Sequence, residues 1–323
     1  MTMTADQATR FADVFDRLAA NVERALQGKS PVVRLALVAM LSEGHLLLED
    51  APGTGKTSLA RALAESVRGT SSRIQFTPDL LPGDITGVSV FDQASGRFVF
   101  HPGAVFANVV LADEINRASP KTQAALLEVM EEGRVTVDGS SHDAGEPFMV
   151  IATQNPIEQA GTYRLPEAQL DRFLIKTSIG YPDHATTLRI LEGATERPHG
   201  ERLPAIITAE GVTVLAAEAR SVHVDAVVND YVARLVQATR DAEETRLGAS
   251  VRAALALVRA SKTRAASLGR HFVIPDDVKA LVVPVLAHRL VLDPEAEFDG
   301  VTAEGVVSQL LLEVPPPGDV TAR

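Results

Sequence analysis

Residues 49–57 read Glu-Asp-Ala-Pro-Gly-Thr-Gly-Lys-Thr and are the most informative segment of the chain. It follows the apolar run His45–Leu48 and precedes a helix-like segment, Ser58–Ala64. A buried strand, a glycine-rich turn and a helix, in this order, form the context that a phosphate-binding loop requires. Glycines let the backbone curl so that successive N–H groups face an anion. The start of the helix adds free N–H groups and the positive end of its dipole.

The loop therefore predicts a nucleoside triphosphate ligand with Mg²⁺. Lys56 is expected to reach the β- and γ-phosphates, and the Thr57 hydroxyl to coordinate Mg²⁺. The strict pattern has glycine where this chain has Asp50, so a tight structural turn remains the alternative. The expected nucleotide contacts are Asp50, Ala51, Pro52, Gly53, Thr54, Gly55, Lys56, Thr57 and Ser58.

The composition is that of a soluble globular protein with room for two domains. The chain has 323 residues, of which 46% are hydrophobic and 23% charged. It has no cysteine, which excludes disulfides, thiolate metal sites and cysteine nucleophiles. Its eight histidines form no pair at helical ligand spacing, which disfavours a zinc site built by the protein.

Charge and hydropathy favour a cytoplasmic protein without nucleic-acid or membrane partners. The formal net charge is −11, tryptophan is absent and only three tyrosines occur, so a polyanion would be repelled overall. The N-terminus, residues 1–6, is polar and lacks the order of a signal peptide. The longest apolar runs, such as Leu35–Leu41, are shorter than the ~18 residues that span a bilayer.

Strand and helix patterns alternate over the first 180 residues, which predicts an α/β domain with a mostly parallel sheet. Expected helices are 5–27, 31–41, 58–67 and 120–131; expected strands are 45–49, 72–77, 87–91, 97–100, 108–113, 134–138, 147–153 and 173–178. After about residue 200 strand signals vanish, and helices are expected at 208–220, 225–240, 250–267 and 275–290. The stretch Thr195–Pro204, rich in proline, glycine and charge, is the expected linker.

A pair of acids supplies the chemistry that a bound triphosphate needs for hydrolysis. The apolar run Asn108–Ala112 ends in Asp113 and Glu114. Asp113 can hold Mg²⁺, and Glu114 can polarise a water for in-line attack on the γ-phosphate. Asn155 ends another apolar strand, where its amide can bind the γ-phosphate or the water; alone it equally marks a turn.

Two arginines have an ambiguous pattern. Arg172 precedes the last expected strand, where it can reach the γ-phosphate of a neighbouring subunit or simply pair with Asp171. Arg252 lies in the first turn of a helix that Ser250 would cap, and by itself reads as a solvated helix arginine.

Four segments together resemble the MoxR family of AAA+ ATPases. They are residues 44–57, residues 111–118, residues 152–156 and residues 165–173, and in order and spacing they match from about residue 20 to about residue 290. An acid at Asp50 is tolerated in that family. Arg164 departs from the pattern, which has proline there.

The resemblance implies a role for each matching residue. Lys56 and Thr57 would form Walker A, Asp113 and Glu114 Walker B, with Thr57 and Asp113 as metal ligands and Glu114 as the water activator. Asn155 would be sensor 1, Arg172 an arginine finger acting in trans, and Arg252 sensor 2. Residues 134–150 would form the hairpin before sensor 1. The implied domains are an AAA+ α/β domain, 1–197, with a helix-2 insert at about 78–103; an all-helical lid, 198–314; and a disordered tail, 315–323.

The implied function is chaperone-like. The family uses ATP in a usually hexameric homo-oligomer to remodel or mature protein clients, often von Willebrand A domain proteins or metalloenzymes. Rival functions are a DNA-acting helicase or loader, a metal-chelatase motor subunit, and a nucleotide-gated scaffold that never turns over.

Overall fold

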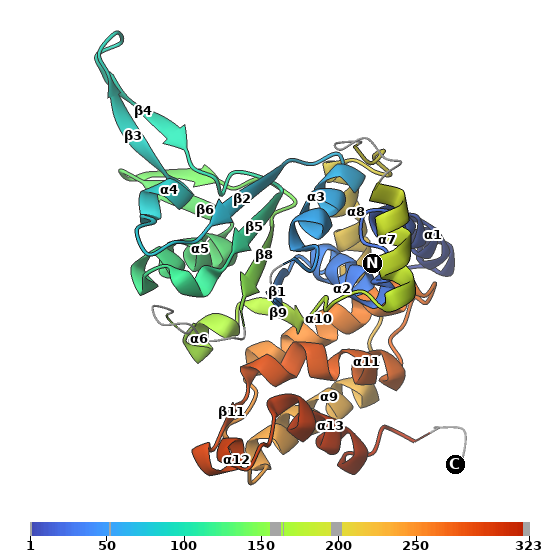
Figure 1. Cartoon of the computed structure of the whole chain (residues 1–323). Coiled ribbons are helices and arrows are strands. Elements are labelled where there is room, and N and C mark those ends of the chain that lie inside the picture. Colours follow the sequence, from blue (N-terminus) through green and yellow to red (C-terminus); the bar gives the residue numbers. More distant parts are fainter. Residues whose placement is uncertain (1, 52, 156–162, 164, 195–201, 319–323) are drawn as a thin grey trace. The chain divides into compact units, whose positions relative to one another are not determined.

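The computed structural model describes residues 2–51, 53–155, 163, 165–194 and 202–318 (Figure 1). The predicted contact Pro52 and the departure Arg164 therefore lie outside the described residues, as do most of the expected linker and the end of the expected tail.

The chain divides into two compact units. The sheet unit comprises Arg17–Leu165 and Thr177–Val214. The helical unit comprises Met1–Asp16, Pro166–Lys176 and Leu215–Arg323. The expected domain boundary at residues 197 and 198 stays a prediction.

A five-stranded sheet in the order β2-β5-β8-β1-β9 organises the α/β part. The ladders that join β1 to β8, β8 to β5 and β5 to β2 are parallel. The strands are β1 (His45–Glu49), β2 (Ser71–Gln75), β5 (Val109–Asp113), β8 (Met149–Gln154) and β9 (Phe173–Thr177). The mostly parallel sheet is confirmed.

The inner strands are predictable because they are continuous apolar runs. All five residues of β5 are buried, as are the first five of β8 and the first four of β1. Such runs are typical of strands covered on both faces of a parallel sheet. The helices of the sheet-unit part of the chain are α1 (Ala5–Glu23), which begins in the helical unit, α2 (Ser30–Leu41), α3 (Lys56–Ser66), α4 (Pro82–Thr86), α5 (Pro120–Glu132) and α7 (His184–Ala194).

Two hairpins extend the sheet unit. Strands β3 (Gly87–Asp92) and β4 (Arg97–Pro102) pair antiparallel and project away from the sheet (Figure 1). Strands β6 (Arg134–Val137) and β7 (Ser140–Asp143) form the second hairpin. Asp138 and Gly139 both have positive φ, as a two-residue hairpin turn requires. This hairpin lies within residues 134–150, where the family resemblance implies one, although β7 was not among the expected strands.

The helical unit is built mainly from helices packed on one another. Helix α10 packs on α9 and α11, and α13 packs on α9 and α11. Its fully buried residues include Tyr231, Leu257, Val278 and Val285. The elements are α6 (Glu167–Leu170), α8 (Ala209–Arg220), which begins in the sheet unit, α9 (Ala226–Asp241), α10 (Val251–Ser267), α11 (Pro275–Leu286), α12 (Pro294–Phe298), α13 (Ala303–Glu313) and the short 3₁₀ turn η2 (Ala287–Arg289). The corresponding turn in the sheet unit is η1 (Ile115–Arg117).

The expectation of an all-helical lid needs one correction. Strands β10 (Thr245–Leu247) and β11 (Val291–Leu292) form a short antiparallel ladder. With three and two residues, they are too short to show a period in sequence, and their pairing is set by tertiary structure. Among the described residues, no helix combines the length and apolarity needed to cross a bilayer.

Candidate functional site

The glycine loop connects the end of β1 to the start of α3. Gly53 and Gly55 have φ of 83° and 100°, a region that L side chains rarely adopt. A Cβ at Gly55 would also lie 2.7 Å from Leu26 Cδ1, whereas one at Gly53 would meet nothing within 4 Å. The loop is thus closely packed at Gly55 and open at Gly53.

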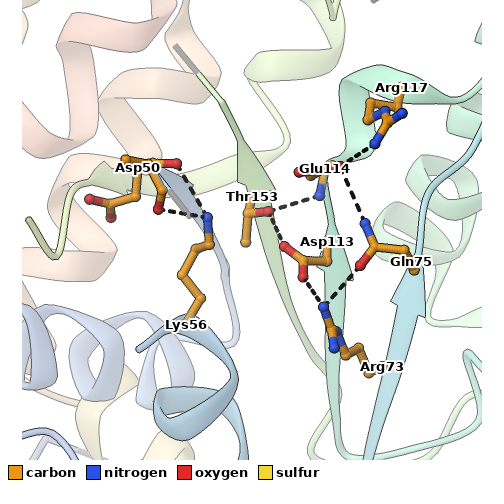
Figure 2. Close-up of polar contacts among 9 residues, drawn as sticks. Asp50, Lys56, Arg73, Gln75, Asp113, Glu114, Arg117 and Thr153 are labelled. Carbon is orange, nitrogen blue, oxygen red and sulfur yellow. Dashed lines mark hydrogen bonds and ion pairs between the residues drawn. The ribbon is translucent and has the colours of Figure 1, made fainter. Parts of the chain in front are cut away.

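Lys56 is the first residue of α3 and turns back over the loop (Figure 2). Its Nζ donates to the carbonyl oxygens of Asp50, at 3.2 Å, and Ala51, at 3.3 Å. Within the part of the chain that the structure describes, no carboxylate pairs with this amino group. The first N–H groups of a helix have no partner within it, so Lys56, Thr57 and Ser58 surround this end of α3 with donors. Donors and an unneutralised cation suit an anionic ligand.

Asp50 uses its side chain for structure. Its two carboxylate oxygens accept the N–H groups of Ile179, at 2.6 Å, and Gly180, at 2.8 Å. The residue is 5% exposed, and its carboxylate faces away from Lys56 (Figure 2). This explains how an acid can replace the first glycine of the loop. The predicted contact between Asp50 and a nucleotide is therefore restricted to the main chain of Asp50.

The two acids lie at the carboxyl end of β5, linked by one hydroxyl. Thr153 Oγ1, near the end of β8, donates to Asp113 Oδ1 at 2.7 Å and accepts the Glu114 N–H at 2.8 Å. Glu114 has a φ of 56°, which is uncommon for a residue other than glycine. Thr153 therefore sets the positions of both acids, and Figure 2 shows it on the side of Asp113 nearer to Lys56.

Each acid also has a basic partner. Asp113 Oδ2 pairs with Arg73 Nη2 at 2.6 Å, and Glu114 Oε2 pairs with Arg117 Nη1 at 2.9 Å. Gln75 Nε2 donates to the same Glu114 oxygen at 3.3 Å. Both arginines are about half exposed, which makes these pairs weak enough to exchange for a ligand.

The sequence did not single out Arg73, Gln75, Arg117 or Thr153. Arg73 and Gln75 belong to β2, whose register opposite β5 places Gln75 beside Asp113. That register depends on strand order, which no local pattern encodes. Thr153 carried a usable signal, because it lies near the end of an apolar strand, two residues before Asn155, and parallel strands end at one edge.

The site can accept Mg²⁺ only with help from the ligand. Thr57 supplies a hydroxyl and Asp113 a carboxylate, both oxygen donors of the kind that Mg²⁺ prefers. No group of three or more acidic or histidine side chains that could hold a metal occurs among the described residues. A metal here would take its other ligands from phosphate and water, the usual arrangement for Mg²⁺ with nucleotides.

Three further predicted residues are placed as follows. Asn155 comes directly after β8, at the edge where the loop and the acids lie, and is half buried. Arg172 lies between α6 and β9, and Arg252 is the second residue of α10, exposed, in a helix that Ser250 caps through the Ala253 N–H. Both arginines belong to the helical unit. Of the predicted site residues, the structure therefore brings together those of the sheet unit, which are the loop, Asp113, Glu114 and Asn155.

Comparison with protein families identifies both parts of the chain. Residues 45–175 match the ATPase family associated with various cellular activities (AAA). Residues 237–310 match the AAA lid domain. The first match spans the loop, both acids, Asn155 and Arg172, and the second includes Arg252.

Several relatives are similar over most of their length. The chain is 47% identical to YeaC of Bacillus subtilis (92% of this chain, 93% of the relative) and 42% identical to Chaperone MoxR1 of Mycobacterium tuberculosis (93% and 81%). It is 34% identical to Protein MoxR of Paracoccus denitrificans (84% and 86%). A crystal structure of a candidate ATPase from Cytophaga hutchinsonii matches with a TM-score of 0.90 at 34% identity, covering 97% of this chain and 98% of that one.

The residues and the relatives agree on one family. The chain contains the glycine loop after β1 and the two acids at the end of β5. It also matches the AAA and lid families, and two of its relatives carry the MoxR name. The chain therefore belongs to the MoxR family of chaperone-like AAA+ ATPases and hydrolyses ATP.

Proposed function

We propose that this ATPase is a motor that forms a hexameric ring, as is usual in the family. The motor would use Mg²⁺ and ATP to remodel or mature protein clients. The single observation that carries the proposal is the meeting of the glycine loop with Asp113 and Glu114 at one edge of the sheet. One relative is named Chaperone MoxR1, and this name supports a chaperone-like function. The proposed clients are von Willebrand A domain proteins or metalloenzymes, as the family resemblance implies.

The proposed site divides the work among residues of the sheet unit. The N–H groups at the start of α3 and Lys56 bind the phosphates, and Asn155 contacts the γ-phosphate or the attacking water. Thr57 and Asp113 would hold Mg²⁺, which neutralises phosphate charge when bound. Glu114 accepts the proton of the attacking water. It must first leave Arg117 and Gln75, so these contacts describe a resting arrangement of the acid.

Catalysis is proposed to need two subunits, because Arg172 acts as an arginine finger on the neighbour's γ-phosphate and Arg252 as sensor 2. A guanidinium placed there stabilises charge in the transition state and contributes about 10³–10⁵ in rate. No subunit would then contain a complete site.

Mixing two inactive variants tests the shared site. Arg172→Ala and Lys56→Ala are each expected to lose activity, the first lacking a finger and the second a phosphate site. In an equal mixture about one interface in four pairs an intact finger with an intact loop, so activity returns. The measurement is steady-state ATPase activity of the mixture, with subunit exchange shown by native mass spectrometry. Mixed rings without recovered activity would contradict the shared site.

The β3–β4 hairpin is the proposed client-contacting surface. Side chains on both of its faces are apolar and exposed: Val88, Val90, Phe91, Phe98 and Val99. Phe91 and Phe98 are directly opposite in the ladder and pack edge to face, with ring centroids 5.4 Å apart. An exposed apolar patch of this kind marks an interaction site, and apolar side chains fit a protein partner better than a polyanion.

Replacing both aromatic residues, Phe91→Ser with Phe98→Ser, should weaken client binding and leave basal ATP hydrolysis unchanged. Burying one phenylalanine contributes about 1.5–3 kcal/mol, so a loss of at least about 10-fold in affinity is expected. The probe is a purified von Willebrand A domain protein that binds the parent saturably, measured by fluorescence anisotropy. Phe298→Ser, which changes an exposed phenylalanine in α12, is the matched control.

Two other results would redirect this proposal. Loss of ring assembly in the hairpin variant would show that the hairpin joins subunits instead of binding clients. Failure of every von Willebrand A domain protein in a panel to bind the parent would reject that client class.

A DNA-acting helicase or loader is the main rival, and a metal-chelatase subunit the second. The net charge of −11 argues against the first. Nanomolar binding to DNA at moderate salt together with DNA-stimulated ATPase activity would favour it over protein remodelling.

A further inference from the structure

Arg289 is buried in the helical unit, and its side-chain nitrogens donate to residues 171–174 and to Val285 of the preceding helix, α11. It belongs to η2, directly after α11, and its side chain is 3% exposed. A guanidinium is rarely buried unless its donors are satisfied, and here each nitrogen has an acceptor.

The acceptors lie on both sides of Arg172. Nε pairs with Asp171 Oδ1 at 2.6 Å, and Nη2 donates to the carbonyl oxygens of Asp171, at 3.2 Å, and Phe173, at 2.7 Å. Nη1 donates to the carbonyl oxygens of Leu174, at 3.4 Å, and Val285. The main chain immediately before and after Arg172 is therefore bound by one rigid side chain.

A neighbour strengthens this attachment. His288 Nε2 lies 3.0 Å from the Phe173 carbonyl oxygen, which also accepts from Arg289. Burial, together with the adjacent Arg289 charge, holds the pKa of His288 well below its usual value, so the ring is neutral and Nε2–H donates. η2 thus contributes two donors to the residue that follows Arg172.

The same segment is linked to the helix that carries Arg252. Ser250 Oγ donates to Asp171 Oδ2 at 3.2 Å, and Ser250 is the N-cap of α10. Asp171 therefore joins three features: the buried guanidinium, the segment with Arg172, and the start of the helix with Arg252.

We propose that Arg289 is a positioning residue for Arg172, fixing the backbone from which the finger projects and tying it through Asp171 and Ser250 to the start of α10. The inference rests on the proposed role of Arg172 as a finger that acts in trans. Arg289 touches no reacting atom and acts only through residues 171–174. Lysine cannot replace it, because an ammonium lacks the planar fork that reaches several carbonyl oxygens at once.

The test compares two matched arginine-to-lysine changes at buried ion pairs. Arg289→Lys keeps a charge beside Asp171 but loses the fork. Arg270→Lys does the same at Asp277, which is 1% exposed and bound by Arg270 through two contacts of 2.6 Å; within the described part of the chain, neither residue has a hydrogen bond to residues 171–174. We expect Arg289→Lys to lower kcat by about 10–10²-fold, since a displacement of about 1 Å can cost that much. KM for ATP should change less than about twofold, and Arg270→Lys should keep the parent's kcat.

A mixture with Lys56→Ala separates positioning from general damage. In mixed rings Arg289→Lys should regain activity as Arg172→Ala does, because its own nucleotide site is intact and the neighbour supplies a well-placed finger. The double variant Arg172→Ala/Arg289→Lys should be no slower than Arg172→Ala alone.

The outcomes are distinguishable. If Arg172→Ala itself shows no rescue in mixed rings, the finger proposal fails. If Arg172→Ala is rescued but Arg289→Lys keeps its activity, or loses it without rescue, the positioning role is wrong. Asp171→Asn provides a second variant with the same expected kinetics. Unfolding of both variants while Arg270→Lys stays folded would show a purely structural role for the Arg289 contacts.

Discussion

Glu114→Gln is expected to slow ATP turnover by about 10²–10⁴-fold while ATP stays bound, because an amide cannot accept the proton of the attacking water. The glutamine keeps the size of the side chain and can still contact Arg117 or Gln75. The Glu114 N–H bond to Thr153 is a main-chain contact and is unaffected. Nucleotide binding depends on the loop and should therefore survive.

Single-turnover kinetics and nucleotide content after rapid desalting measure the two effects separately. Glu128→Gln, an exposed change on α5, is the control and should behave as the parent. Thermal stability should change little, since the lost ion pair is partly exposed and such pairs contribute about 0–1 kcal/mol. A Glu114→Gln variant with full turnover would exclude Glu114 as the water activator.

The central sheet was predictable from sequence because its inner strands are continuous apolar runs. The expected strand 45–49 is β1, and the expected strands 108–113 and 147–153 differ from β5 and β8 by one or two residues at their ends. The expected helix 120–131 is α5, which has Pro120 at its first position, and its N-cap Ser119 accepts the Thr122 N–H. These are local signals that tertiary structure does not override.

Several elements outside the inner strands of the sheet were not predicted from the sequence. Proline followed by glycine, as at Pro82 and Gly83, is typical of a break between elements, yet Pro82 opens α4 and Asp84 accepts the N–H of Leu81 at its start. Helices α7, α12 and α13 and the β10–β11 ladder were not predicted. Two or three residues of strand have no measurable period, and their pairing depends on the packing of the elements around them.

The site shows the same division between motif and partner. Lys56, Thr57, Asp113, Glu114 and Asn155 follow from strand-turn patterns, and the parallel ladders bring their elements to one edge. Their partners do not follow, because Arg73 meets Asp113 across 40 residues of chain and only the order β2-β5 explains it. Arg289 binds Asp171 across 118 residues, and as a lone arginine after an apolar helix it carried no signal.

Lys56→Ala is expected to abolish nucleotide binding at concentrations that saturate the parent. The amino group now donates only to two loop carbonyls, which it can leave for phosphate oxygens of opposite charge. A hydrogen bond to a charged group contributes about 1.5–3 kcal/mol, so even one lost contact can weaken binding by about 10–10²-fold. The fold should persist, because the lost contacts are half buried and neutral at the acceptor.

The claim that the turn after β1 binds a triphosphate can be measured by titration calorimetry of Mg²⁺–ATP. The reference protein for this titration carries Glu114→Gln, so that ATP is not consumed. Lys56→Ala is introduced as a second change in this background. Lys121→Ala, which removes an exposed lysine of α5, is the matched control. We expect Mg²⁺–ATP to bind to the Glu114→Gln protein and to its Lys121→Ala derivative, and no detectable binding to its Lys56→Ala derivative. Equal affinity in all three proteins would contradict the claim that this turn binds a triphosphate.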